Sequence, residues 1–399
     1  MDRQDLIALL TPEGMALLRS PDTVDDERDV VRLVSRLRAA GHDARLVSAV
    51  LTQVRLRRRA EEKFGPFAER MLFTEDGLQQ ATRLQVAAHH ANRFRTAGVR
   101  TLADLGCGIG ADSLAFASLG FELVAVDADE VTAAVATHNL AMFEDVEVRH
   151  GRAEDQDLEP FDGLWFDPAR RESAEGRTRR LHRPDDWSPP VDWILGLADE
   201  HVLGVKLAPG IDHELLPPAD RAETQWVSVD GQLVEATVWA GGAQRAGVGR
   251  SALVLGRAGS NELVGTGAAE DVPVAALGAF LHEPDAAVIR SRLIGDLARR
   301  IDAHMIAPDI AWMTTDDEVR SPFAQSFRVL EVLPLHVPNI KRELRARGIG
   351  RLEIKKRGVD VDPAEFRTRL DLRGDGDATL VLTRVGDERK AILTERIGG

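Results

Sequence analysis

Three glycines at alternate positions, Gly106, Gly108 and Gly110, constrain this chain more than any other feature of its sequence. An apolar run over 99–105 precedes them, and an apolar helical pattern over 113–119 follows at once. This order is typical of the strand–loop–helix unit that opens a doubly wound α/β fold. Glycine permits the sharp turn and lets a ligand approach the backbone closely. We therefore expect an α/β fold with a ligand site at this loop.

Asp104 indicates which ligand the loop binds. Gly106, Gly108 and Ala111 also satisfy G-x-G-x-x-A, so spacing alone leaves a dinucleotide possible. Asp104 lies two residues before the first glycine, near the end of the predicted buried strand. A carboxylate there would repel a pyrophosphate and attract a cationic group, such as the α-ammonium of S-adenosylmethionine (SAM). We interpret the stretch as a SAM loop; a glycine turn without a ligand is the alternative.

The composition is that of a globular protein. A chain of 399 residues, 44% apolar and 29% charged, is long enough for two or three domains. The single cysteine, Cys107, excludes a disulfide within the chain, and no apolar run reaches the length of a membrane span. The residues after Met1 lack the layout of a signal peptide. We therefore expect a cytoplasmic protein.

Charge is distributed unevenly along the chain. The net charge of -14 argues against nucleic-acid binding over the whole surface. Residues 341–373 nevertheless contain eleven Lys or Arg against six Asp or Glu. This cluster predicts either a basic patch for nucleic acid or an ordinary solvated surface.

Polar turns follow each further predicted strand. The predicted parallel strands cover 99–105, 121–126, 145–150, 161–166 and 202–207. Asp127 ends the second strand, 23 residues after Asp104, where it can bond ribose hydroxyls. The alternative is that it caps the next helix, and Asp127 and Asp129 can divide these two roles. The third and fourth strands lead into 151–155 and 167–171. All these turns fall at the ligand-binding edge of such a sheet.

Periodicity predicts the organisation around this sheet. We expect a helical domain over 1–68, and a helix over 83–95 that Thr82 caps. Three antiparallel strands, at 225–229, 233–239 and 251–255, would close the sheet, the first two as a hairpin. A connector over 258–325 would contain a helix at 286–301, and 326–399 would form a small α+β domain.

The order Asp104-x-Gly-x-Gly-x-Gly110, Asp127, Gly151-Arg-Ala153 and Asp167-Pro168 resembles class I SAM-dependent methyltransferases. The resemblance implies a Rossmann-like methyltransferase domain over 69–257. Gln80-Ala-Thr82 is similar to trimethylguanosine-synthase-type RNA methyltransferases and their bacterial relatives. Lys355-Lys-Arg-Gly-Val-Asp-Val-Asp362 and Leu380-Val-Leu-Thr-Arg384 resemble the THUMP-like domain attached to such enzymes.

This resemblance implies a methyltransferase that acts on RNA, either tRNA or rRNA, at a base nitrogen. It also implies the residues that contact SAM: Thr82, Asp104, Gly106, Cys107, Gly108, Gly110, Asp127, Ala128, Arg152 and Ala153. In the C-terminal domain it points to Lys355, Lys356 and Arg357 as RNA contacts.

The predicted acceptor site departs from the family pattern. Base-amine methyltransferases carry Asp/Asn/Ser-Pro-Pro-aromatic after the fourth strand, and this chain has Asp167-Pro-Ala-Arg170. Asp167 and the Pro168 carbonyl can still accept hydrogen bonds from an amine, so both are candidate catalytic residues. The stacking aromatic is absent from its place, and Trp165 or Trp187 would have to replace it. Arg170 and Arg171 would contact substrate phosphate or pair with nearby acids.

Three function classes follow from the sequence. The first is an RNA methyltransferase that grips RNA with its C-terminal domain. The second is a methyltransferase for a small molecule or a protein. The third is an RNA-binding protein with a vestigial SAM site, which the intact loop and Asp127 disfavour. We expect no metal, because His89 and His90 are adjacent and have no third ligand near them in the sequence.

Overall fold

The computed structural model describes residues 1–19, 27–170, 187–256, 259–267, 270 and 272–398. The chain divides into two compact units. The first comprises Met1–Leu207 and Val238–Gln244, and the second comprises Ala208–Thr237 and Arg245–Gly399. No helix in the described ranges is both long and apolar enough to cross a bilayer.

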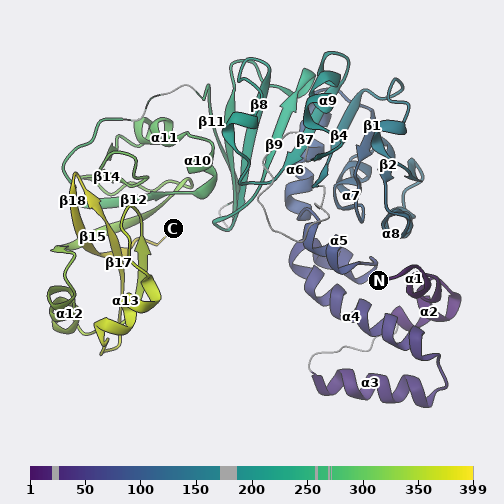
Figure 1. Ribbon diagram of the computed structural model, residues 1–399, viewed down its shortest axis with the longest axis horizontal. Helices are drawn as coiled ribbons and strands as arrows, with labels where there is room; N and C mark the ends of the chain where they lie inside the picture. Colours follow the sequence, from purple (N-terminus) through teal and green to yellow (C-terminus); the bar gives the residue numbers. More distant parts are fainter. Residues whose placement is uncertain (20–26, 171–186, 257–258, 268–269, 271, 399) are drawn as a thin grey trace, which may run out of the picture. The chain divides into compact units, whose positions relative to one another are not determined.

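The first unit begins with the predicted helices. These are α1 (Arg3–Leu9), α2 (Pro12–Leu18), α3 (Glu27–Ala39) and α4 (Ala44–Phe64), visible in purple in Figure 1. Asp2, Thr11 and Asp43 cap α1, α2 and α4 by accepting hydrogen bonds from backbone N–H groups of the first turn. α1 and α2 have seven residues each, too few to be stable in isolation, so tertiary packing must stabilise them.

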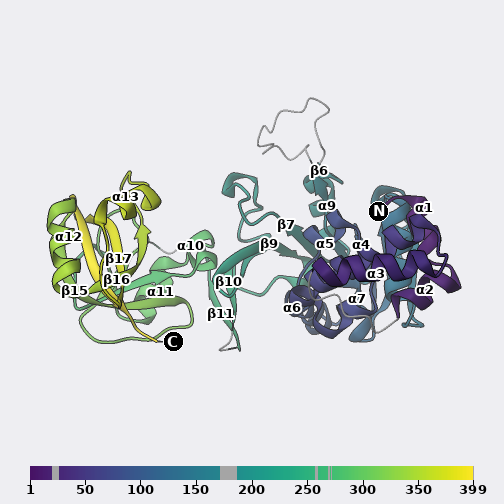
Figure 2. The ribbon, with the colours of Figure 1, turned by 90° about the horizontal axis from the view of Figure 1, so that it is seen from below.

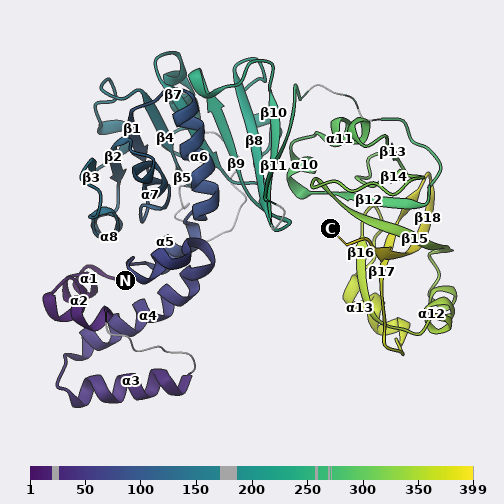
Figure 3. The same cartoon turned by 180° about the vertical axis from the view of Figure 1, so that it is seen from behind.

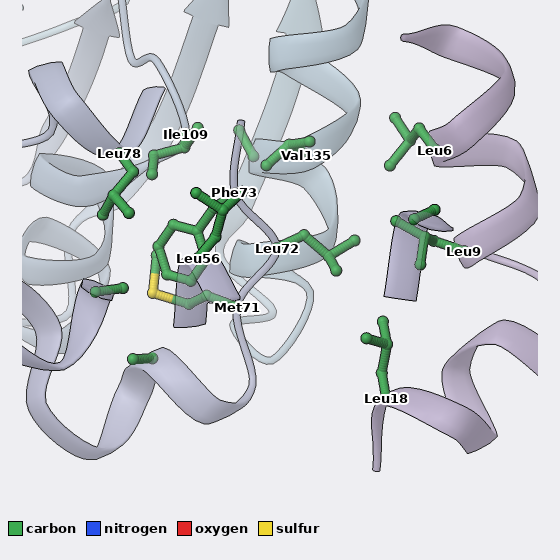
Figure 4. Close-up of a cluster of buried hydrophobic side chains, with 14 of the residues drawn as sticks. Leu6, Leu9, Leu18, Leu56, Met71, Leu72, Phe73, Leu78, Ile109 and Val135 are labelled. Carbon is green, nitrogen blue, oxygen red and sulfur yellow. The ribbon is translucent and has the colours of Figure 1, made fainter. Parts of the chain in front are cut away.

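That packing joins the helices to the glycine loop. Figure 4 shows Leu9 and Leu56 in the same buried cluster as Leu72, Phe73 and Ile109. Ile109 lies within the glycine loop, whereas Leu9 and Leu56 come from α1 and α4. The N-terminal helices and the loop therefore share one hydrophobic core.

The sheet of the first unit places the predicted turns together. Its parallel strands lie in the order β7-β4-β1-β2-β3. They are β1 (Thr101–Leu105), β2 (Glu122–Asp127), β3 (Val146–His150), β4 (Gly163–Phe166) and β7 (Val202–Leu207). Leu105 aligns with Val126 on one side and Phe166 on the other. This register brings Gly106, Asp127 and Asp167 to one edge and confirms the predicted α/β class.

Helices α6 (Leu84–Thr96) and α7 (Ala111–Ser118) cover an aromatic layer of the first unit. Trp165 is fully buried there, with ring contacts to His90, Phe94 and Trp239. Between β2 and β3, α8 (Glu130–Leu140) contributes Val135 to the core shared with the N-terminal helices. The apolar runs of the sequence thus form two buried clusters in the first unit, one with the N-terminal helices and one with the aromatic layer.

The second unit contains a correction to the predicted strand directions. Its first strands are β8 (Ala222–Val229), the start of β9 (Gln232–Ala240), β10 (Arg250–Gly256) and β11 (Gly259–Gly265). The predicted hairpin between β8 and β9 is present, and Asp230 and Gly231 both have positive φ. The expectation of antiparallel pairing throughout is wrong, because β10 pairs with β8 in parallel. The chain crosses over between β9 and β10 instead of turning back directly.

The rest of the second unit contains a seven-stranded sheet in the order β13-β14-β12-β15-β18-β17-β16. Figure 2 labels β15, β16 and β17 of this sheet. Its strands are β12 (Phe280–Pro284), β13 (His304–Met305), β14 (Met313–Thr315), β15 (Ala324–Pro334), β16 (Ile349–Lys356), β17 (Gly376–Val385) and β18 (Glu388–Arg396). Helices α12 (Val337–Ala346) and α13 (Pro363–Leu370) pack on it through Ile340, Leu344 and Phe366. The strand and helix pattern predicted for 326–399 is confirmed.

Residues 258–325 differ from the expected connector. They contribute β12, β13 and β14 to the same sheet as β15. The helix expected at 286–301 is divided into α10 (Ala286–Arg290) and α11 (Ile294–Arg300), because Arg292 adopts a left-handed φ of 60°. β13 and β14 are only two and three residues long, too short to produce a recognisable strand pattern in the sequence.

Candidate active site

The glycine loop leaves the sheet under tight backbone constraints. Gly106 has a φ of +98°, and a Cβ atom on it would lie 2.6 Å from the carbonyl oxygen of Asp167. Gly110 precedes α7 with a φ of +86°, and Gly108 has open space where a Cβ would lie. Cys107 is buried, and burial raises the pKa of its thiol well above the ordinary value. The loop therefore carries no charged side chain between Gly106 and Gly110, and Gly108 is the position in it where a ligand could approach the backbone.

Asp104 lies beneath this loop, with its carboxyl group fully buried. Its Oδ2 accepts a hydrogen bond from Ser113 Oγ at 2.5 Å. Its Oδ1 is also buried, and no hydrogen-bond partner for it occurs in the described parts of the chain. Burial, reinforced by the charge of Asp112, raises the pKa of Asp104 well above its ordinary value. Because an unsatisfied buried oxygen is costly, this atom is poised to accept a bond from a ligand.

Asp127 and Asp129 divide two roles at the end of β2. The carboxylate of Asp127 accepts hydrogen bonds from the backbone N–H groups of Gly108 and Asp129, each at 2.9 Å. Partial burial raises the pKa of Asp127, although these two bonds oppose the shift. Asp129 caps α8 by accepting from the backbone of Thr132 at 2.8 Å. Asp127 thus fixes the glycine loop from the next strand.

The outer wall of the predicted cofactor site comes from the turns after β2 and β3. Ala128 is exposed, and its carbonyl oxygen lies 3.2 Å from the Nε2 atom of His150. Arg152 is exposed and pairs with Glu154 at 2.8 Å. Ala153 is buried at the start of a short 3₁₀ helix. These predicted residues follow strands that end at the ligand edge.

Thr82 does not cap the helix that follows it, which corrects the expectation. Arg83 occupies the N-cap of α6, with no side-chain capping bond. The hydroxyl of Thr82 instead donates to Asp112 at 2.7 Å, and Asp112 also bonds the Nδ1 atom of His90 at 2.8 Å. Burial favours the neutral acid, but His90 and Thr82 hold the pKa of Asp112 below its ordinary value. This buried cluster joins α6 to the first turn of α7, which follows the glycine loop, and the sequence interpretation missed it.

Asp167 directly follows β4, and its side chain pairs with Lys206, a residue that the sequence interpretation did not identify. Lys206, from β7, donates to Asp167 Oδ2 at 2.7 Å. The Asp167 side chain is 34% exposed, whereas that of Lys206 is 14% exposed. Pro168 is buried beside them. The one available signal was a lysine near the end of an otherwise apolar strand, 202–207.

The remaining parts of the predicted acceptor site are only partly described. Trp165 is fully buried in the aromatic core, so it does not replace the missing stacking residue. Trp187 is buried in a short strand paired with Ala169–Arg170. The backbone of Arg170 pairs with that of Trp187 in these two short strands, whereas Arg171 lies outside the described residues.

The predicted RNA contacts of the second unit differ among themselves. Lys355 pairs with Glu283 at 2.7 Å and lies over the ring of Phe327. Arg357 donates to the Ala311 carbonyl at 3.1 Å, and burial lowers its pKa. Lys356 is exposed. Within the described ranges no group of three or more His, Cys, Asp or Glu could hold a metal ion.

Comparison with known proteins places this arrangement in context. Two uncharacterized SAM-dependent methyltransferases from strains of Mycobacterium tuberculosis are each 35% identical to the chain over 338 residues, 83% of this chain and 91% of theirs. A crystal structure from Porphyromonas gingivalis W83, assigned as a methyltransferase, matches with a TM-score of 0.72 at 19% identity, covering 94% of this chain and 100% of its own. A family model described as THUMP domain-like matches residues 324–396, and a domain of unknown function matches 2–60.

Proposed function

Because this chain belongs to the SAM-dependent methyltransferases, with SAM as its cofactor, we propose that it methylates a base nitrogen of tRNA or rRNA. The observation that carries this proposal is the contrast between two carboxylates at one edge of the sheet. Asp104 is fully buried beneath the glycine loop, whereas Asp167 is partly exposed and adjoins Gly106. One carboxylate thus suits a cationic cofactor and the other suits an acceptor N–H.

Asp104 would hold the α-ammonium of SAM, because its buried Oδ1 has no partner in the described chain. The backbone of Gly106, Cys107, Gly108 and Gly110 would line the cofactor. Asp127 would accept bonds from the ribose hydroxyls, as expected for an acidic residue ending the second strand. The remaining residues proposed to border the cofactor are Thr82, Ala128, Arg152 and Ala153. In this role Thr82 also keeps Asp112 in place through its hydroxyl.

SAM supplies a methyl group activated by its sulfonium. The carboxylate of Asp167 and the carbonyl of Pro168 would accept hydrogen bonds from the acceptor amine and fix the direction of its lone pair. Positioning of this kind accounts for much of the rate gain when two reactants are held in line. Lys206 fixes Asp167 through a charge-assisted hydrogen bond. Asp167 can also take the proton that the amine loses.

RNA is the proposed acceptor because the same chain carries a THUMP domain-like segment over 324–396. In this proposal Lys356 contacts the RNA backbone, and Arg170 and Arg171 would contact substrate phosphate. A second candidate, a small-molecule or protein acceptor, is favoured by one observation. Lys355 and Arg357 are both directed to Glu283 within the chain, which fits a structural role.

Mass spectrometry of nucleosides distinguishes these acceptors. A strain that lacks the gene should lose one methylated nucleoside from tRNA or rRNA, and the wild-type gene should restore it. Asp167→Ala and Asp104→Ala should fail to restore it. Asp145→Ala is the matched control, because Asp145 is exposed and precedes β3. An unchanged nucleoside profile would reject RNA and leave the second candidate.

A further inference from the structure

Two lysines donate hydrogen bonds to the backbone carbonyl groups at the C-terminal end of helix α5 (Glu75–Gln80). The ammonium of Lys63 donates to the carbonyl oxygens of Leu78 and Gln79, each at 2.8 Å, and of Ala81 at 2.7 Å. Lys206 reaches the remaining carbonyl, that of Gln80, at 3.4 Å. A helix end leaves such carbonyls without intrahelical partners, and cations are favoured there. Here charged side chains bond all four consecutive carbonyls.

The segment that these lysines hold borders the proposed cofactor site. At its start, a Cβ on Gly77 would lie 2.5 Å from Cγ2 of Ile109, in the glycine loop. At its end, Thr82 bonds Asp112 in the first turn of α7. Lys206 joins the segment to Asp167 as well. Residues 77–82 therefore run from the glycine loop to the acceptor carboxylate.

Lys63 comes from the N-terminal helices and lies before the segment 69–257 predicted as the methyltransferase domain. It lies in the last turn of α4, and α5 lies between α4 and α6 in Figures 1 and 3. Its three donors match the three carbonyls, so a protonated lysine satisfies all of them. The neutral amine has two N–H groups and leaves one carbonyl without a donor.

From this geometry we infer that Lys63 is a positioning residue for the cofactor site, through which the N-terminal helical part holds the wall formed by residues 77–82. The inference rests on the proposed cofactor site and adds a residue to it that touches neither cofactor nor acceptor. The N-terminal helices then serve SAM binding in addition to stability.

The charges around Lys63 make this role dependent on pH. Burial lowers the pKa of Lys63 to about 8, and the positive charges of Arg83 and Lys206 contribute, while Glu62 opposes them. Glu62 itself pairs with Arg83 at 2.7 Å. On α5 the acidic Glu75 and Asp76 lie in the first turn, away from the carbonyl end. Lys63 thus loses its proton as the pH rises through about 8, and with it one bond to the wall.

Titration calorimetry with S-adenosylhomocysteine tests the inference on the full chain at pH 7 and pH 9.5. At pH 7, Lys63→Met should bind about tenfold more weakly than the wild type, because the substitution takes the charged donor from three backbone carbonyls of the wall. The ratio of the two affinities should shrink at pH 9.5, where wild-type Lys63 is largely neutral. Asp104 titrates in both proteins, so the ratio isolates Lys63. Lys63→Arg stays charged and should keep more of its affinity at pH 9.5 than the wild type.

The control is Lys356→Met, which removes an exposed lysine of the second unit and should match the wild type at both pH values. An equal affinity of Lys63→Met and the wild type at pH 7 would overturn the inference. So would a gap of the same size at both pH values, which would mark a role independent of the charge. If Lys63→Met does not fold, equal losses for Lys63→Arg and the wild type between the two pH values would overturn it. Absence of binding to the wild type would instead reject the proposed cofactor site.

Discussion

At the scale of single residues, the hydrogen-bond partners of each buried carboxyl group determine the direction in which its pKa shifts. Asp104 and Asp112 are both buried beside the glycine loop, yet their pKa values shift in opposite directions. Asp104 has one hydroxyl partner, and burial dominates. Asp112 has His90 and Thr82, and together they outweigh its burial. Asp104 favours its neutral form when buried alone and its charged form beside a cation, so it would select a cationic cofactor over a neutral or anionic one.

This contrast predicts that SAM binding releases a proton. Below its raised pKa the Asp104 carboxyl is protonated in the free protein, and an adjacent ammonium favours the carboxylate. Affinity should therefore rise with pH through the pKa of free Asp104, and the measured binding enthalpy should depend on the buffer. Calorimetry in phosphate and in Tris measures the released proton.

Asp104→Asn supplies the control for this proton release. It should bind SAM about 10- to 100-fold more weakly, as expected for loss of a charged hydrogen bond, and without a buffer-dependent enthalpy. Equal enthalpies in both buffers for the wild type would show that Asp104 is already ionised in the free protein.

At the scale of elements, local sequence signals predicted most of the first unit. The parallel strands, the glycine loop and Asp167 were predictable because strand ends and turns are encoded by neighbouring residues. The contacts of Lys206 and His90 were not predictable, because each joins elements that only the tertiary fold brings together. The parallel pairing of β8 and β10 escaped prediction for the same reason, since it depends on a crossover.

Asn139 illustrates such a contact between elements. This buried residue of α8 accepts from the backbone N–H of Leu72 at 2.7 Å and donates to the carbonyls of Leu72 and Ile109. Asn139→Ala should lower the free energy of unfolding by about 2–4 kcal/mol, because three buried backbone groups lose their partner. Urea denaturation measures the loss, with Asn92→Ala, on the exposed face of α6, as the control. A change as small as that of the control would mean that water or a backbone shift replaces these bonds.

At the scale of the whole molecule, an acidic chain must offer RNA a local cationic surface. The net charge is -14, so contacts with phosphate depend on cations that acids in the chain do not neutralise. Much of the basic cluster at 341–373 is paired: Asp371 alone contacts Lys341, Arg345 and Arg373. The count of basic residues in the sequence therefore overstates the charge available to a ligand.

Of the three predicted RNA contacts in the second unit, Lys356 is exposed. Substituting it can therefore test RNA binding without a large effect on stability. Lys356→Ala should weaken tRNA or rRNA binding and reduce the slope of log affinity against log salt by about one phosphate contact, since counterion release scales with the contacts made. Lys355→Ala should chiefly lower the free energy of unfolding, because it removes the ammonium that pairs with the carboxylate of Glu283. Filter binding between 50 and 200 mM salt measures the slope, and Lys390→Ala, which removes a lysine paired with Glu388, matches the change in charge. An unchanged slope for Lys356→Ala would remove β16 from the RNA surface. Absence of RNA binding by the wild type would favour a small-molecule or protein acceptor, with the second unit as a structural part of the enzyme.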